Sequence, residues 1–91
     1  MDKTRKKLQI QNKLGLHARA AALLVQTVNR FSADVRISKD GQTVNGRSIM
    51  GLLTLAAAQG SRIQVEVEGK EAPEALRAIE SLLEKKFYEA E

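Results

Sequence analysis

The sequence has no cysteine and only three aromatic residues, Phe31, Phe87 and Tyr88. Without cysteine the chain can form neither disulfides nor thiolate metal sites, which is compatible with a reducing cytoplasm. No stretch is apolar for long enough to span a bilayer, and the opening "MDKTRKK" is not followed by the hydrophobic region of a signal peptide. We therefore expect a cytoplasmic protein with no stable membrane association.

Charge of both signs is abundant, with 15 basic and 11 acidic residues and a formal net charge of +4. This surplus could attract nucleic acid, a membrane surface or an acidic protein, although interspersed charges are also typical of an ordinary solvated surface. An RNA-binding sheet usually carries stacking aromatic side chains on its strands, and the three aromatics here fall at or beyond the ends of the predicted helices. We expect no nucleic-acid partner.

The hydrophobic pattern switches repeatedly between a period of two and a helical period. Alternation predicts strands at residues 5–11, 33–38, 42–44 and 62–68, with a tight turn at Asp40-Gly41. Spacings of three and four predict helices from Ala18 to about Phe31, over residues 48–58, and from Pro73 onward, the last with a buried stripe that extends to Phe87.

The predicted element order is therefore β-α-β-β-α-β-α within a chain of 91 residues. We expect an α/β (α+β) fold, an open-faced β-sandwich with a four-stranded antiparallel sheet and three helices on one face, because the strands alternate apolar and polar residues. Residues 1–91 make one small domain. Several unrelated functions use such a fold, including small-ligand regulatory modules and nucleic-acid binders.

The only histidine, His17, lies in "KLGLHARAAALLV", between a glycine loop and an alanine-rich run. It precedes the first predicted helix, where the first backbone N–H groups have no partners and the helix dipole favours an anion such as a phosphoryl group. The same dipole disfavours a protonated imidazole, which leaves a ring nitrogen free as a nucleophile. Arg19, in the first turn, could bind phosphoryl oxygens.

Other interpretations of His17 follow from the same position. An isolated histidine at a helix start is most simply a polar cap. We expect no metal site, because the chain has no second histidine, no cysteine and no carboxylate in the loop or first turn. A hydrolytic triad is disfavoured as well, since neither a nucleophile nor an orienting acid lies nearby in the sequence. Local chemistry thus allows phosphoryl acceptance and does not exclude the capping role.

Two stretches resemble motifs of one family, the histidine-containing phosphocarrier proteins (HPr) of the bacterial phosphoenolpyruvate-dependent sugar phosphotransferase system. "GLHARAA" resembles the active-site motif, and "NGRSIMGLLTLAAAQG", residues 45–60, resembles the regulatory-serine segment at the family's usual distance. The resemblance covers essentially the whole chain. It implies one HPr-like phosphocarrier domain over residues 1–91 that is not an enzyme and needs no cofactor of its own.

The resemblance also implies roles for particular residues. His17 would accept a phosphoryl group on Nδ1 from enzyme I and pass it to an enzyme IIA domain, with Arg19 steadying the group. Ser48 matches the serine that HPr kinase/phosphorylase phosphorylates, although a helix cap is an equally simple role for it. Contacts with partners would fall on Leu16, Ala20, Ile49, Met50, Leu52 and Leu53. We expect the protein to be a monomer.

Ala20 departs from the family pattern, which usually has proline at this position. Proline pre-sets the first turn of a helix, but alanine is an excellent helix former and can adopt the same conformation. We therefore expect phosphorylation to survive. A paralogue that acts mainly in nitrogen or carbon regulation is an alternative. A small-ligand-binding regulatory module is a second alternative, which explains the topology but not the Gly-Leu-His-Ala-Arg sequence.

Overall fold

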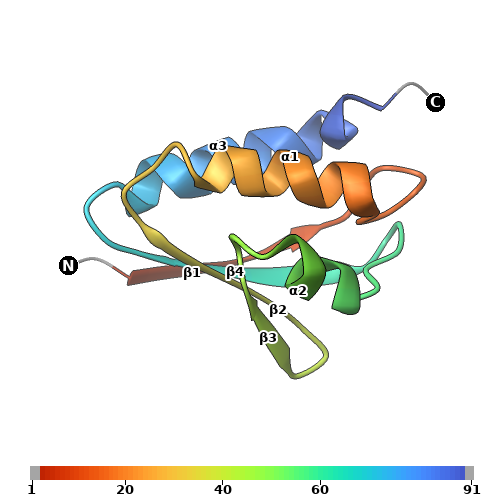
Figure 1. Ribbon diagram of the computed structural model, residues 1–91, viewed down its shortest axis with the longest axis horizontal. Coiled ribbons are helices and arrows are strands. Elements are labelled where there is room, and N and C mark those ends of the chain that lie inside the picture. The colour runs from red at the N-terminus through yellow and green to blue at the C-terminus, as the bar shows by residue number, and fades with distance from the viewer. Residues whose placement is uncertain (1–2, 90–91) are drawn as a thin grey trace.

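The computed structural model describes residues 3–89 and contains seven main elements in the predicted order (Figure 1). The strands are β1 (Lys3–Gln9), β2 (Asp34–Lys39), β3 (Gln42–Asn45) and β4 (Arg62–Glu68). The helices are α1 (Ala18–Val28), α2 (Ile49–Thr54) and α3 (Ala72–Glu84), followed by a short helical turn, η1 (Lys86–Tyr88).

The four strands form one antiparallel sheet in the order β1-β4-β2-β3. Residues directly opposite each other share a face, so the pairs Leu8–Ile63 and Val35–Val67 place their side chains on the side that the helices cover. Figure 1 shows α1 and α3 running side by side over this face, and the two helices are in contact. The predicted open-faced fold class is confirmed.

The core lies between the sheet and the helices. It is aliphatic except for Phe87, and its fully buried members include Leu24 and Val28 of α1 and Ile79 of α3. Each such side chain stabilises the fold by roughly 1.5–3 kcal/mol when it is removed from water. Within residues 3–89 no helix is both long enough and apolar enough to cross a membrane.

Several predicted boundaries were wrong. β1 occupies residues 3–9 rather than 5–11, and α2 is six residues long rather than extending to residue 58. α2 ends early because Ala56 adopts a left-handed backbone with φ 50°, which a right-handed helix cannot continue through.

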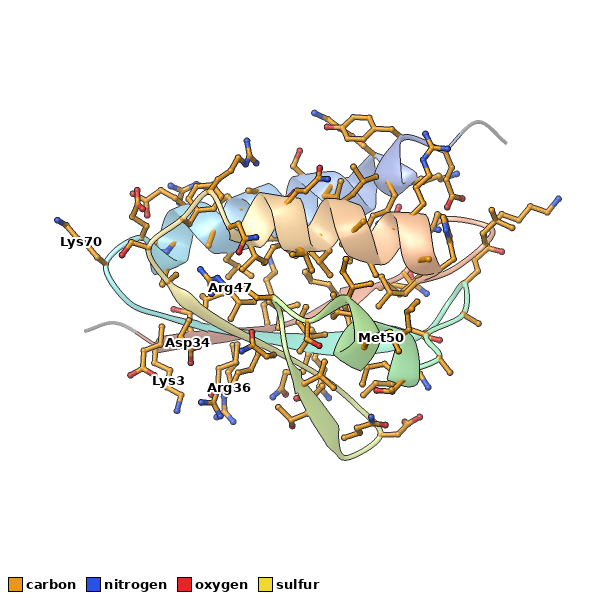
Figure 2. All side chains as sticks on the ribbon, in the orientation of Figure 1. Lys3, Asp34, Arg36, Arg47, Met50 and Lys70 are labelled. Carbon is orange, nitrogen blue, oxygen red and sulfur yellow. The ribbon has the colours of Figure 1, made fainter. Side chains whose placement is uncertain are left out.

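The first helix ends at Val28 rather than near Phe31. The carbonyl groups exposed at this end accept hydrogen bonds from a side chain of another segment. The Arg47 guanidinium donates hydrogen bonds to the carbonyl oxygens of Val28 and Phe31, at 3.5 and 3.1 Å. Arg47 lies next to the C-terminal end of α1 (Figure 2). A cation at a helix C-terminus also interacts favourably with the helix dipole, so Arg47 links the loop before α2 to the end of α1.

Candidate functional site

The loop that carries His17 is held against the segment after α2 by backbone contacts. The Leu16 N–H donates to the Ala57 carbonyl at 2.8 Å, and the Gly60 N–H donates to the Ile10 carbonyl at 2.8 Å. Gly15 adopts φ +71°, and a Cβ built there would lie only 2.6 Å from the Ala57 carbonyl oxygen. The loop therefore needs glycine at residue 15 both for its backbone conformation and for its close approach.

His17 is the N-cap residue of α1, in extended backbone conformation, with φ −90° and ψ 179°. Its carbonyl accepts the first helical hydrogen bond, from the Ala21 N–H at 2.8 Å, but its side chain makes no cap hydrogen bond. The interpretation of the imidazole as a simple polar cap is therefore wrong. The ring is 29% exposed beside the open N-terminus of the helix, where an anion is favoured.

The imidazole contacts an acid that local sequence reasoning could not find. Nε2 of His17 pairs with Oε1 of Glu89, whose side chain is only 10% exposed. The same Oε1 accepts a hydrogen bond from Nδ2 of Asn12 at 2.8 Å, and Nδ2 also donates to the Gly15 carbonyl at 2.7 Å. Asn12 is fully buried, and its Oδ1 has no partner within residues 3–89. Both residues were missing from the predicted site: Glu89 contacts His17, and Asn12 contacts Glu89.

The Glu89 carboxyl is ionised at neutral pH. Burial alone raises its pKa, but hydrogen bonds from His17 and Asn12, the charge of His17 and the Leu14 backbone N–H together outweigh burial, so the pKa lies below its usual 4.5. Since the pKa is lowered in the folded state, Glu89 stabilises the fold fully above about pH 4.5. This stabilisation is lost as the pH falls through the folded-state value.

An unusual turn after α3 brings Glu89 to this place. Lys86, Phe87 and Tyr88 all have left-handed backbone angles, with φ of 54°, 54° and 60°. Phe87 is buried in the core, although it belongs to this turn and not to the predicted stripe of α3. Each left-handed residue costs roughly 1–2 kcal/mol, and burying one phenyl ring offsets part of this cost. Glu89, which follows this turn, therefore lies beside His17 at the start of α1.

Arg19 lies in the first turn of α1, with an exposed side chain. Its guanidinium makes no hydrogen bond or ion pair with any other residue of the described part of the chain, so it is available to an incoming anion. Among residues 3–89, no group of three or more histidine, cysteine or acidic side chains is arranged to hold a metal ion. The site as described is thus one imidazole, one partly buried carboxylate and one exposed cation.

Ser48 is the N-cap of α2, and the predicted capping role is confirmed. Its Oγ accepts a hydrogen bond from the Gly51 N–H at 2.9 Å, while its backbone is extended, with φ −108° and ψ 107°. Gly51 fits closely, because a Cβ there would lie 3.0 Å from this Oγ and 3.1 Å from Cβ of Val44. The hydroxyl is half-buried at the start of a short helix.

Replacing Ser48 by alanine is expected to lower the free energy of unfolding by about 1 kcal/mol, because the Gly51 N–H loses its acceptor. Denaturant titration of the two proteins measures this difference. Ser32→Ala, at an exposed serine outside the helices, serves as the control and should change stability by less than about 0.5 kcal/mol. Equal stabilities for wild type and Ser48→Ala would mean that the cap contributes nothing.

Comparison with known proteins decides the family. The model of the PTS HPr component phosphorylation site family matches residues 4–85. The phosphocarrier protein HPr of Xylella fastidiosa is 46% identical over 82 residues, which cover 90% of this chain and 92% of that protein. The chain belongs to the HPr phosphocarrier family. HPr proteins are carriers of a phosphoryl group rather than catalysts, so the chain is not an enzyme.

Solved HPr structures have the same fold. A crystal structure of HPr from Thermoanaerobacter tengcongensis superimposes with a TM-score of 0.91 at 42% identity, covering 97% of this chain and 99% of that one. The catabolite repression protein Crh of Bacillus subtilis, described as a dimer with a swapped domain, has a TM-score of 0.74 at 41% identity, covering 89% and 93%. The HPr family therefore includes regulatory relatives as well as carriers.

The predicted partner-contact residues of this chain divide into exposed and buried groups. Met50 lies on α2 (Figure 2). Its side chain is 73% exposed, Ile49 is 39% exposed and Leu53 is half-buried. The prediction was wrong for Ala20 and Leu52, which are 0% exposed, and for Leu16, which is 6% exposed. These three side chains belong to the hydrophobic core, where a partner cannot reach them.

Ala20 occupies the third position of α1, within the first turn. Proline suits a first turn because it has no N–H, and alanine instead adds an N–H that has no acceptor inside its own helix at this position. The side chain is fully buried. α1 therefore begins at Ala18, directly after His17, without the proline that the motif usually contains.

Proposed function

We propose that this protein accepts a phosphoryl group on Nδ1 of His17 from phospho-enzyme I and passes it to enzyme IIA domains in sugar uptake. The observation that carries the proposal is the position of the chain's only histidine, half-exposed at the open N-terminus of α1 in a member of the HPr family. We further propose that it does so in the cytoplasm and as a monomer.

The chemistry needs no cofactor. The Nδ1 lone pair attacks the phosphorus of the donor phosphohistidine, the donor N–P bond breaks, and the donor imidazole leaves with the bonding electron pair. Because donor and product are both phosphohistidines, the step is reversible. The free N–H groups of the first turn of α1 and the guanidinium of Arg19 would stabilise the transferred oxygens.

Incubation with enzyme I and labelled phosphoenolpyruvate tests the carrier role. The expected product is an acid-labile, base-stable phosphoryl adduct, which an added enzyme IIA domain then removes. A full adduct that no enzyme IIA accepts would favour the regulatory alternative, which the likeness to Crh supports. Absence of an adduct with an enzyme I that phosphorylates another HPr would contradict the carrier role.

We also propose that Ser48 is a regulatory phosphorylation site for HPr kinase/phosphorylase. A phosphate at the start of α2 meets the N-terminal N–H groups of that helix, while its charge would oppose an acidic partner at the neighbouring Ile49 and Met50. With ATP and this kinase, we expect an adduct in His17→Ala but none in Ser48→Ala. Label that persists in Ser48→Ala would assign the modification to another residue.

A further inference from the structure

We propose that Glu89 is a positioning residue for His17: it fixes the imidazole with its proton on Nε2, so that Nδ1 carries the attacking lone pair. The inference rests on the proposed function for its role in phosphoryl transfer, but the state of the ring can be measured without a partner. Glu89 lies beyond residues 4–85, the part of the chain that matches the HPr family model.

A series of hydrogen bonds determines which atom carries the proton. The Gly15 carbonyl can only accept, so the atom of Asn12 that lies 2.7 Å from it is the amide nitrogen Nδ2. The same Nδ2 donates to Oε1 of Glu89 at 2.8 Å. An ionised carboxylate has no proton to give, so Nε2 of His17 must be the donor in its contact with Oε1.

The neutral imidazole carries one proton, and holding that proton on Nε2 leaves Nδ1 as the nucleophile. The orientation of the ring is fixed at the same time, because buried Asn12 and the Phe87 anchor restrict where the carboxylate can lie. A carboxylate on the far nitrogen of a reacting histidine has this function in hydrolytic triads, although the reaction there is different.

Glu89 also has an electrostatic role during transfer. When Nδ1 of His17 bonds to phosphorus while Nε2 keeps its proton, the His17 ring becomes an imidazolium. The electrons of the broken N–P bond stay on the imidazole of the donor. The carboxylate on Nε2 stabilises this positive charge as it develops. An uncharged side chain at residue 89 could preserve the tautomer but not this stabilisation.

Three variants separate the two effects. Glu89→Ala removes both the acceptor and the charge, whereas Glu89→Gln keeps an acceptor oxygen that Asn12 holds in place and removes only the charge. Glu84→Ala is the matched control, because Glu84 ends α3 on the exposed surface and its carboxylate makes no ion pair or hydrogen bond within residues 3–89. Thermal unfolding of each variant checks that the fold is retained.

The first measurement is the pair of imidazole ¹⁵N chemical shifts at alkaline pH, where the ring is neutral. In wild type, Glu89→Gln and Glu84→Ala we expect one tautomer, with the proton on Nε2. In Glu89→Ala the two shifts should move towards each other as the second tautomer appears. Unchanged shifts in Glu89→Ala overturn the proposal, whatever enzyme I does.

The second measurement is the rate of phosphorylation by enzyme I. Glu89→Ala, which loses the hydrogen bond to a charged group, should be slower than wild type by about tenfold. Glu89→Gln, which keeps a hydrogen bond but lacks the charge, should also be slower than wild type, and Glu84→Ala should not change. Equal rates in all four proteins would overturn the electrostatic role. If wild type is never phosphorylated but Glu89→Ala shows the second tautomer, the proposed function is contradicted and the positioning role is supported.

Discussion

His17→Ala is expected to abolish the phosphoryl adduct that forms with enzyme I and phosphoenolpyruvate. The loss should be complete, because the chain contains no second histidine and no cysteine that could take the group instead. The fold should survive the change, since the imidazole is partly exposed and caps no helix N–H, with some loss of stability because the Glu89 carboxylate loses a hydrogen-bond donor. Intact-mass spectrometry after the reaction measures the adduct directly.

Arg19→Ala provides the graded counterpart of this experiment. It removes one exposed cation from the first turn and leaves the nucleophile in place, so it should slow the reaction and not prevent it.

A full adduct on the His17→Ala protein would show that the acceptor is a different residue. That result would remove the basis for every role proposed around the start of α1.

Gly15→Ala is expected to lower the free energy of unfolding by about 3 kcal/mol. The new methyl group would lie 2.6 Å from the backbone oxygen of Ala57, and alanine would also have to adopt φ +71°. Neither strain can be relieved by rotating a side chain, so the loop must move away from Ala57. Because His17 follows two residues later, slower phosphorylation should accompany the loss of stability, and chemical denaturation measures the latter.

Gly60→Ala is the matched control for this prediction. Gly60 also has a left-handed backbone, with φ +89°, but a Cβ there has nothing within 4 Å. It should therefore cost only the conformational strain of about 1–2 kcal/mol and leave phosphorylation unchanged. If both variants lost the same stability, the close approach of Gly15 to Ala57 would contribute nothing.

The strands and the helix starts were readable from the sequence because each depends on local patterning. Alternating Ile63, Val65 and Val67 predicted β4 and its buried face, and Pro73 predicted the first turn of α3. The position of His17 at the start of α1 followed in the same way. The predicted boundaries were wrong where contacts between distant residues decide them. One example is the end of α1, where Arg47 donates hydrogen bonds to the carbonyls of Val28 and Phe31.

The environment of His17 could not be predicted, because its partner comes from the other end of the chain. Glu89 is 72 residues away in sequence, and it reaches the imidazole through three left-handed residues, none of which is glycine. No turn signal marks such a bend. The short α2 raised a different difficulty, since six residues leave the buried face ambiguous, and Leu52 proved to be in the core while Met50 is exposed.

The most direct test of the account is NMR of the phosphorylated protein labelled with ¹⁵N in histidine. Only one imidazole is present, so every histidine signal comes from His17. We predict that phosphorus couples to Nδ1 and that Nε2 keeps its proton, as its contact with Glu89 requires. Phosphorus on Nε2, or a phosphorylated protein whose histidine signals do not change, would contradict the account.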